Sequence, residues 1–437
     1  MAVDLKGVID TKNGLVSRRA FVEQEIFDTE MEQVFGRCWL FIAHESQIPN
    51  PGDFFTSYMG VEPVIVIRDS AGKIGAFLNT CRHRGNAVCL ADQGNAASFT
   101  CSYHAWTYGN DGKLIGVPNA MGAYFDKLDM EQWGLIPVAQ LKSYKGLIFA
   151  TFDPAAPSLE DYLGEHKFYL DLWLDRREGG TEVIGGVHKW IMPANWKFAA
   201  DNFVGDTLHF VPSHASAVMS GLFSSARALS INPRSGFQTS SGYGHGIIVS
   251  YQPGNRHINV PDLEEYEASI EDEAVQRLGP SVRNISPIVS TIFPNFSPFY
   301  GRATIRCWHP RGPDKTEIWA WCLVDKEAPP EVKDRILKHY LWTFGPAGSA
   351  EQDDMGNWQH CTRNSAGPIA KRYPLNYMLA MDDRHYDENY PGYMSMIMSE
   401  HDARLFYDVW GEMMAGKSWP EIKLELDKIK SKISVIS

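Results

Sequence analysis

The sequence lacks the features that mark membrane, secreted and nucleic-acid-binding proteins. None of its apolar runs reaches the about 18 residues that a membrane-spanning helix needs. The first ten residues contain Asp4, Lys6 and Asp10 and lack the apolar core of a signal peptide. The net charge is −12 and no run of Lys and Arg is present, which disfavours nucleic acid as a partner. We therefore expect a cytoplasmic protein that binds neither membranes nor nucleic acid.

Cysteine is scarce and does not follow the spacing of a disulfide framework. The 437 residues contain seven cysteines, an odd number, which is compatible with a reducing compartment. Internal repeats and a GxGxxG dinucleotide fingerprint are also missing from the sequence. If the protein uses electrons from a nicotinamide, separate proteins must therefore deliver them.

The composition is that of a folded protein with more than one domain. Hydrophobic residues make up 44% and charged residues 22% of the chain, which argues against global disorder, and the length allows two or three domains. Apolar residues at helical spacing predict a helix over residues 17–35. Short strands and Gly-containing turns predict a β-domain over 38–157, and a helix capped by Ser158 begins a second domain over 158–437.

Two short motifs each pair one cysteine with one histidine. Cys81 and His83 frame the first motif, and after seventeen residues Cys101 and His104 frame the second. A zinc finger groups Cys with Cys and His with His, whereas here each loop presents one of each. This arrangement favours a [2Fe-2S] cluster of the Rieske type, with both cysteines on one iron and both histidines on the other. A zinc site, or buried cysteines beside unrelated histidines, is the alternative.

A second group of possible metal ligands lies at residues 202–214. On a helix, Asp206 and His209 would share a face. His209 and His214 would diverge by roughly 140° on an ideal helix, but Pro212 can end or kink the helix and bring the two rings together. Two converging imidazoles suit iron or zinc, and histidines buried in the core are the alternative.

The first pair of motifs carries a family resemblance. CRHRG at 81–85, CSYHAW at 101–106 and the turn at 108–114 resemble the Rieske domain of the ring-hydroxylating oxygenases. A cytochrome bc-type Rieske protein is the nearest competitor, and it has an extra cysteine in each loop, where this chain has Asn86 and Tyr103. The resemblance without that disulfide implies a lower reduction potential, suited to electrons from a ferredoxin.

The resemblance continues into the catalytic domain of the same family. An acidic cluster at 351–354 would by itself indicate a solvated helix N-terminus. In the family, the second Asp of an Asp-Asp pair binds iron, and this position corresponds to Asp354. His209, His214 and Asp354 would then form a 2-His-1-carboxylate facial triad that leaves one face of Fe(II) open to O2 and substrate.

The resemblance also assigns a catalytic role to Asp206. Its spacing lets it orient the ring of His209, and the matching Asp of the family also reaches a cluster histidine of a neighbouring subunit. Asp206 would therefore bridge His209 to His104 of the next chain. The alternative is an Asp on the surface of a helix.

A mostly apolar substrate pocket is a further implication of the resemblance. Two small residues, Ser349 and Ala350, stand where some relatives carry aromatic side chains, so we expect bulky or substituted rings to be accepted. Ordinary core packing is the alternative for every predicted wall residue. The full predicted set is Asn202, Phe203, Thr207, Phe210, Phe293, Phe344, Ser349 and Ala350.

Together these patterns predict an α+β protein. The resemblance implies a Rieske β-domain, a helix-grip-like catalytic domain with an antiparallel sheet and mononuclear iron, and residues 1–37 packed on the catalytic domain. It implies a terminal oxygenase α subunit that takes electrons from a ferredoxin and an NAD(P)H-dependent reductase, and that converts an aromatic ring and O2 to a cis-dihydrodiol. An α homotrimer with a small β subunit, α3β3, is the implied assembly. The alternatives are a Rieske monooxygenase of the salicylate-hydroxylase type and an electron-transfer protein with a degenerate second site.

Overall fold

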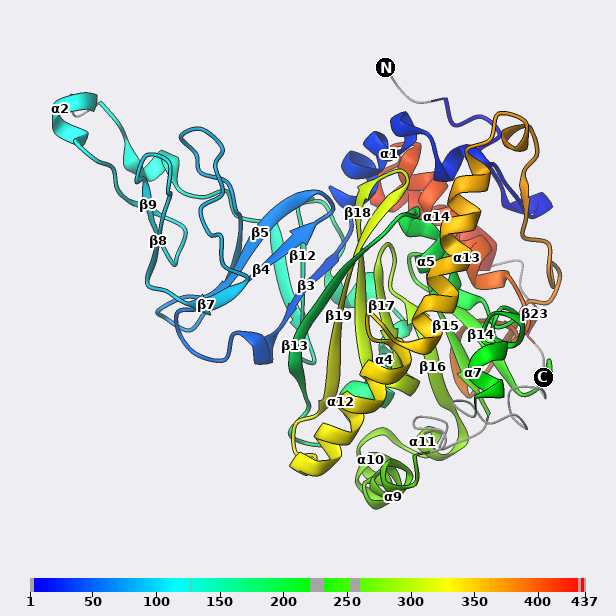
Figure 1. Cartoon of the computed structure of the whole chain (residues 1–437). Coiled ribbons are helices and arrows are strands. Elements are labelled where there is room, and N and C mark those ends of the chain that lie inside the picture. The colour runs from blue at the N-terminus through cyan, green and yellow to red at the C-terminus, as the bar shows by residue number, and fades with distance from the viewer. Residues whose placement is uncertain (1–3, 126, 221–231, 252–259, 431–433, 436–437) are drawn as a thin grey trace. The chain divides into compact units, whose positions relative to one another are not determined.

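The computed structural model describes residues 4–125, 127–220, 232–251, 260–430 and 434–435. These residues form two compact units. One unit is Gly36–Ala156, and the other comprises the described chain up to Phe35 and from Pro157 onward. Figure 1 labels many of the helices and strands of both units.

The Gly36–Ala156 unit consists of three small antiparallel sheets. Their strand orders are β11-β12-β3, β6-β5-β4-β7 and β10-β9-β8. The strands are β3 (Leu40–His44), β4 (Asp53–Met59), β5 (Glu62–Arg68), β6 (Ile74–Leu78), β7 (Gln93–Asn95), β8 (Ser98–Thr100), β9 (Thr107–Gly109), β10 (Leu114–Gly116), β11 (Gln140–Tyr144) and β12 (Leu147–Thr151). Strands dominate this region, as the short strands and Gly-containing turns predicted, and a short helix, α2 (Ala120–Tyr124), lies between β10 and β11 in the chain.

Two hairpins of this unit owe their turns to an Asp followed by Gly. The Asp69 carboxylate accepts the amides of Ala71 and Lys73, both at 2.8 Å, in the turn between β5 and β6. Asp111 accepts the amide of Lys113 at 3.1 Å in the turn between β9 and β10. Each turn also needs one residue with a left-handed backbone, and glycine takes this conformation freely. Gly72, three residues after Asp69, has φ +83°, and Gly112, directly after Asp111, has φ +82°.

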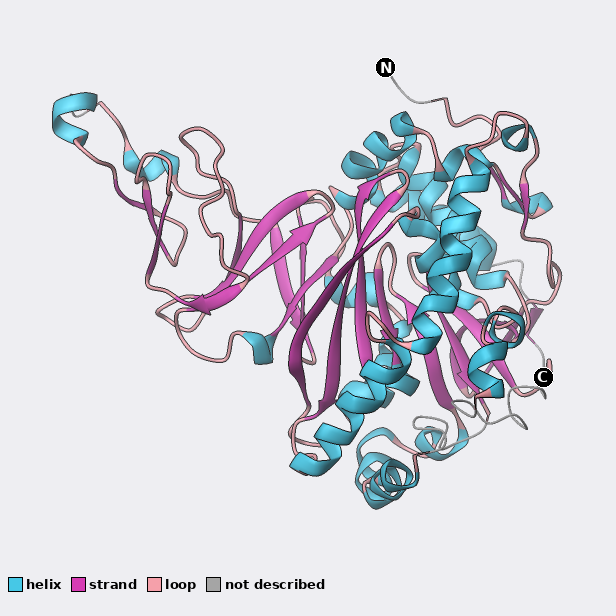
Figure 2. Ribbon diagram, in the orientation of Figure 1, coloured by secondary structure: helices cyan, strands magenta, loops and turns pink. Residues whose placement is uncertain are grey.

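The larger unit is built on a ten-stranded sheet (Figure 2). All neighbouring strands are antiparallel except the edge pair β21 and β23, which is parallel. The order is β13 (Thr181–Met192), β19 (Lys315–Asp325), β18 (Thr304–Gly312), β17 (Phe296–Phe299), β16 (Ser286–Thr291), β15 (His245–Ser250), β14 (Gly236–Ser241), β22 (Tyr390–Met396), β21 (His385–Asp387) and β23 (Ser434–Val435). This sheet with its covering helices confirms the predicted fold class.

Several helices of this unit pack on the ten-stranded sheet. α5 (Trp196–Gly205) and α14 (His401–Met414) contact β14, β15 and β16, and α12 (Pro330–Phe344) contacts β19 and the following α13 (Ser349–Ser365). Within the described residues, no helix combines the length and apolar composition needed to cross a bilayer. The remaining helices of this unit are α1 (Gln24–Glu30), α3 (Leu159–Leu163), α4 (His166–Leu174), α6 (Phe210–Ser213), α7 (Ala215–Met219), α9 (Pro261–Ser269), α10 (Glu271–Leu278), α11 (Ser281–Asn284) and α15 (Trp419–Lys430).

The helix predicted over 17–35 is interrupted. A 3₁₀ turn covers Arg18–Phe21, and α1 starts only at Gln24 because Glu23 is extended, with φ −89° and ψ 127°. A π-helical turn, Met31–Phe35, follows α1. The apolar periodicity continues through these changes, since Phe21 and Ile26 are both fully buried. The spacing of apolar residues therefore predicted the helical region, but it did not predict the interruption between Phe21 and Gln24.

Candidate metal centres

The two Cys–His loops have the same backbone hydrogen bonds. The amide of Cys81 donates to the carbonyl five residues ahead at 2.8 Å, and its carbonyl accepts the amide of Gly85 at 2.9 Å. Cys101 repeats both bonds at the same lengths, with Ala105 in the place of Gly85. Gly85 and Ala105 both have left-handed backbones, with φ +75° and +55°. The matched turns present the two cysteines, both buried and unoxidised, in equivalent ways.

The two histidines of the loops lie side by side. The ring centres of His83 and His104 are 4.4 Å apart at 74°, and His83 also stacks on Trp106 at 5.1 Å. Nδ1 of His83 is buried and has no hydrogen-bond partner among the described residues. A buried imidazole nitrogen without a partner is unfavourable unless it binds a metal. The residues therefore fit a [2Fe-2S] cluster held by two cysteines and two histidines.

Each loop sulfur has a hydrogen-bonding neighbour. The Tyr108 hydroxyl lies 3.3 Å from Sγ of Cys81 and accepts the amide of Arg82 at 3.0 Å, so its hydrogen is available to the sulfur. The Asn86 amide donates to Sγ of Cys101 at 3.6 Å. Sequence reasoning considered Asn86 only as a position that lacks cysteine, and its donor role depends on the fold. Hydrogen bonds to sulfur tune the reduction potential of such a cluster.

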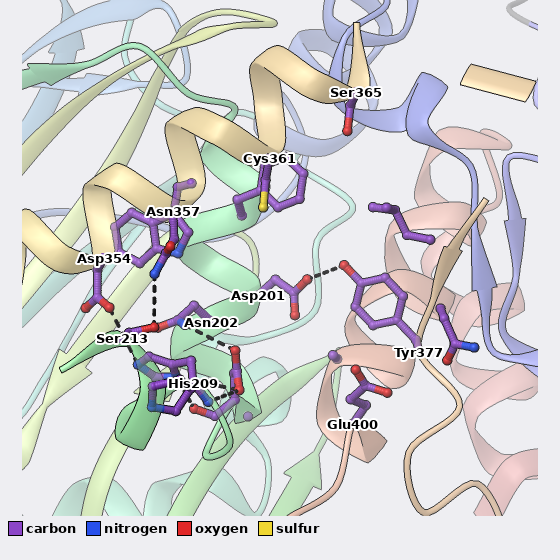
Figure 3. Close-up of a pocket in the computed structure, with 18 of the residues that line it drawn as sticks. Asp201, Asn202, His209, Ser213, Asp354, Asn357, Cys361, Ser365, Tyr377 and Glu400 are labelled. Atoms are coloured by element: carbon purple, nitrogen blue, oxygen red, sulfur yellow. Dashed lines mark hydrogen bonds and ion pairs between the residues drawn. The ribbon is translucent and has the colours of Figure 1, made fainter. Parts of the chain in front are cut away.

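A second ligand set lies in the larger unit. Side-chain ligand atoms of His209, His214 and Asp354 all lie within 4.8 Å of one another. Nε2 of His209 is 3.6 Å from Oδ1 of Asp354, and Figure 3 shows these two side chains. Nε2 of His214 is 3.3 Å from the same oxygen. That oxygen is buried and has no hydrogen-bond partner among the described residues. Two imidazoles and a carboxylate that converge in this way fit a divalent metal such as iron.

The chain brings Asp206 to His209 through a turn, whereas the sequence predicted one helix face. α5 ends at Gly205, and Asp206 is extended, with φ −99° and ψ 96°. Nδ1 of His209 donates to the Asp206 carbonyl at 2.7 Å, and the His209 amide donates to the Asp206 carboxylate at 3.1 Å. These bonds leave Nε2 of His209 directed at Asp354. The short α6 that follows ends one residue after Pro212, immediately before His214.

Asp353 is a contact of the site that sequence reasoning missed. Its Oδ2 is 3.4 Å from Nδ1 of His214 and accepts the Ser216 hydroxyl at 3.3 Å. Adjacent residues of a helix point about 100° apart, so the two carboxylates of the Asp-Asp pair reach different atoms of the same ring. Asp354 approaches Nε2 of His214 and Asp353 approaches Nδ1. The Asp353-Asp354 pair in the sequence was the signal for this contact, but the family resemblance assigns a role only to Asp354.

Negative charge dominates the electrostatics of this site. Burial lowers the pKa of His209, but the Asp206 and Asp354 carboxylates outweigh burial and raise this pKa to about 9. Burial raises the pKa of Asp206, yet its hydrogen bonds and charge interaction with His209 bring that pKa below its usual value. The site therefore favours a cation among its carboxylates.

A cavity of about 640 Å³ opens beside these ligands. His209, Asp354, Asp206 and Asn202 line it, and Asn202 donates to the Asp206 carboxylate at 3.3 Å. Further acidic groups on its wall are Asp201 and Glu400, as Figure 3 shows. Asp201 accepts hydrogen bonds from the hydroxyls of Tyr377 at 2.6 Å and Tyr407 at 3.1 Å. This cavity is polar and acidic on the side of Asp206.

Several predicted wall residues cluster on the other side of the ligands. The ring centre of Phe210 lies 5.5 Å and that of Phe344 lies 6.1 Å from the ring centre of His214. Phe344 and Ala350 belong to one buried apolar cluster against which Phe210 packs. The Phe203 ring is buried against Phe299, Trp308 and Trp358. These residues provide an apolar surface next to the His214 imidazole.

Three other predicted wall residues have different surroundings. The Thr207 hydroxyl donates to the Ile397 carbonyl at 2.7 Å. Phe293 is fully buried and packs against Phe406, with 5.0 Å between the ring centres. Ser349 is exposed at the first position of α13. The structure therefore brings Phe210, Phe344 and Ala350 together near the ligands but not these three.

Comparisons with known proteins give the family. Residues 38–144 match the Rieske [2Fe-2S] domain, and residues 159–416 match the ring hydroxylating alpha subunit (catalytic domain). The chain belongs to the ring-hydroxylating α-subunit family. This α subunit is 41% identical to biphenyl 2,3-dioxygenase subunit alpha of Rhodococcus jostii (strain RHA1), over 95% of this chain and 92% of the relative. It is 39% identical to benzene 1,2-dioxygenase subunit alpha of Pseudomonas putida, over 96% and 95%.

A solved structure agrees with this membership. Naphthalene 1,2-dioxygenase with indole bound superposes on this α subunit with a TM-score of 0.91 and 32% identity, over 97% of each chain. The α subunit is an oxidoreductase, a Rieske-type aromatic-ring-hydroxylating dioxygenase subunit. Its cofactors are a Rieske [2Fe-2S] cluster and a mononuclear iron, as predicted.

Proposed function

We propose that this α subunit is a terminal oxygenase that converts aromatic hydrocarbons of the biphenyl, benzene or naphthalene class, or related aryl acids, to cis-dihydrodiols. Cys81, His83, Cys101 and His104 would hold the cluster, and His209, His214 and Asp354 the iron. The observation that carries the proposal is the approach of two Nε2 atoms to one buried oxygen of Asp354, at 3.6 and 3.3 Å, beside apolar rings.

The surrounding residues hold the ligands and exclude water. When bound, the iron supplies O2 activation and the cluster supplies single electrons. The Asp206 carbonyl fixes the tautomer of His209 by accepting its Nδ1–H, and Asp353 contacts the corresponding nitrogen of His214. Phe210 and Phe344 would bind the substrate ring by apolar contact and keep water away from it.

Asp206 would also join two copies of the chain. It lies on the wall of the acidic cavity, where His104 of a second copy could hydrogen-bond to it. The cluster loops carry Arg82 and the exposed Arg84, which complement the carboxylates of Asp206 and Glu400 on the cavity wall. We propose on this basis an α homotrimer, with a small β subunit in an α3β3 assembly, that receives electrons from a ferredoxin and its NAD(P)H-dependent reductase.

Product analysis tests the proposed reaction. The purified oxygenase, supplied with a ferredoxin and reductase of the related systems, is incubated under ¹⁸O2 with benzene, biphenyl, naphthalene and salicylate. We expect cis-dihydrodiols that carry two labelled oxygens, with the larger rings accepted because Ala350 is small and buried near Phe344. Phenols with a single labelled oxygen as the main products would instead establish a monooxygenase, and a strict preference for benzene would contradict the expected pocket size.

A further inference from the structure

A buried ion pair lies one helical turn from Asp354. Arg306 on β18 and Glu351 on α13 are both fully buried, and Nη1 of Arg306 donates to Oε2 of Glu351 at 2.5 Å. Glu351 and Asp354 are three residues apart on α13 and therefore share a helix face. The pair links the sheet to the turn of α13 that carries the Asp354 carboxylate.

The same arginine holds the neighbouring helix. Nη2 of Arg306 donates to the carbonyl of Phe344, the last residue of α12, at 2.7 Å. Its guanidinium lies 5.3 Å from the ring centre of Phe203 and 5.5 Å from that of Phe344. Arg306 therefore connects the apolar surface beside His214 and the start of α13 through one planar group.

The Arg306–Glu351 pair contributes little to the net stability of the fold. Removal of two charges from water costs about as much free energy as their attraction returns, so a buried pair contributes little net stability. Oε1 of Glu351 and Nε of Arg306 are buried and lack hydrogen-bond partners among the described residues, which adds to that cost. A planar guanidinium that donates two hydrogen bonds instead fixes the distance and angle between the elements it joins, here β18, α12 and α13.

We propose that Glu351 and Arg306 are positioning residues for the iron-binding carboxylate of Asp354 and for Phe344. Glu351 sets the rotation and depth of the first turns of α13, and Arg306 holds that setting together with the end of α12. The inference rests on the proposed assignment of Asp354 as an iron ligand. Loss of the pair should therefore disturb the iron site and the apolar wall together, while the Rieske cluster stays intact.

The test compares Glu351→Gln with a matched variant of another buried pair. Nη2 of Arg176 donates to Oδ2 of Asp325 at 2.7 Å, both side chains are almost fully buried, and Asp325 lies at the end of β19. Asp325→Asn removes the same kind of charge, and the side-chain partners of Asp325, Arg176 and Tyr266, lie outside α13. Each oxygenase variant is purified in its assembled form, and mononuclear iron retained against a ferrous chelator is measured with the Rieske EPR signal as internal standard.

The expected result separates positioning from general stability. Glu351→Gln should retain the Rieske signal, lose mononuclear iron with an affinity reduced about 10- to 100-fold, and alter the EPR spectrum of the ferrous–nitric oxide adduct. Asp325→Asn should lower the thermal midpoint but leave iron affinity and that spectrum unchanged. Glu351→Asp, which retains the charge, should restore part of the affinity, and it serves in place of the Gln variant if that protein does not fold.

The experiment distinguishes failure of the positioning role from failure of the assignment of Asp354 as an iron ligand. Wild-type iron affinity and an unchanged nitric oxide spectrum in both Glu351 variants would overturn the positioning role. Asp354→Ala, which removes the ligand oxygen, identifies a failure of the underlying assignment: if this variant retains mononuclear iron, Asp354 is not a ligand. Loss of iron in Asp354→Ala together with normal iron in the Glu351 variants therefore rejects only the inference about the ion pair.

Discussion

The carbonyl oxygen of Asp206 accepts the Nδ1–H of His209 at 2.7 Å, directly after the end of α5. The Asp206 side chain is half-exposed on the wall of the acidic cavity. Its backbone therefore orients one imidazole, while its carboxylate is accessible to a second molecule. These two functions of one residue can be separated by mutation, because the carbonyl remains when the side chain is removed.

Asp206→Ala should retain both metals but lose turnover. The backbone bond to His209 persists in the variant, whereas the proposed contact with His104 of a second copy is lost. Iron content, the Rieske EPR signal and product formation are measured together. Asp334→Asn, which removes an exposed carboxylate that pairs with Lys338 on α12, is the control and should retain activity. Substantial activity of Asp206→Ala with a normal metal content would reject the bridging role.

Tyr108→Phe should lower the reduction potential of the Rieske cluster. The variant loses the hydroxyl that lies 3.3 Å from Sγ of Cys81. A hydrogen bond with a net contribution of about 0.5–1.5 kcal/mol corresponds to a decrease of roughly 20–65 mV for a one-electron couple. Redox titration monitored by EPR measures the shift. Tyr103→Phe is the control, since Tyr103 is 59% exposed, and an equal shift in both variants would contradict the specific role of Tyr108.

His245→Gln should reduce the loss of stability in weak acid. Burial lowers the pKa of His245 to about 4. Its Nδ1 accepts the Phe293 amide at 3.0 Å, so Nε2 donates to the Tyr162 carbonyl at 2.7 Å, and the folded protein needs the neutral ring. Between pH 6.5 and 4 the unfolded chain binds the additional proton, so the contribution of His245 is present above pH 6.5 and is lost as the pH falls to 4.

Denaturant unfolding at pH 7.5 and pH 5 measures this contribution. We expect the wild type to lose about 2 kcal/mol more than His245→Gln between these two pH values. The variant should already be less stable at pH 7.5 because it cannot reproduce both hydrogen bonds. Parallel pH dependences of the free energy of unfolding in the two proteins would show that the folded protein does not keep His245 neutral at pH 5.

Glu30→Gln should destabilise the larger unit strongly. The fully buried Glu30 carboxylate accepts hydrogen bonds from Lys197 Nζ at 2.5 Å, Trp410 Nε1 at 2.8 Å and Trp196 Nε1 at 3.0 Å. The variant would leave the Lys197 ammonium buried without a counter-ion, which costs about 3–5 kcal/mol.

Thermal and denaturant unfolding provide the measurement for Glu30. Asp427→Asn, which breaks the exposed Lys423–Asp427 pair at 3.1 Å, is the matched surface control and should change stability by less than about 1 kcal/mol. Glu30→Gln combined with Lys197→Met should recover much of the loss, since no unpaired charge remains. Equal effects of Glu30→Gln and Asp427→Asn on the free energy of unfolding would contradict the expected cost of a buried Lys197 without a counter-ion.

The sequence by itself indicated both proposed metal sites, because their Cys and His residues come from short local motifs. Cys81 and His83 share one loop, Cys101 and His104 share another, and His209 and His214 share a third. The number of residues between such ligands limits their geometry before any tertiary contact forms. Family resemblance added Asp354, and the fold class followed from the same two segments.

Tertiary structure decided how these ligands are held. Glu351 meets Arg306 across 45 residues and His214 meets Asp353 across 139, and no local pattern reports such pairs. Even Asp206 and His209, three residues apart, meet through a turn at the end of α5 and not along a helix face. Hydrogen bonds and ion pairs act over a few ångströms, whereas sequence spacing limits distance only within one element. The identity of the proposed Cys and His ligands was therefore local information, whereas the orientation of His209, His214 and Asp354 came from the packing of α5, α12 and α13 against the sheet.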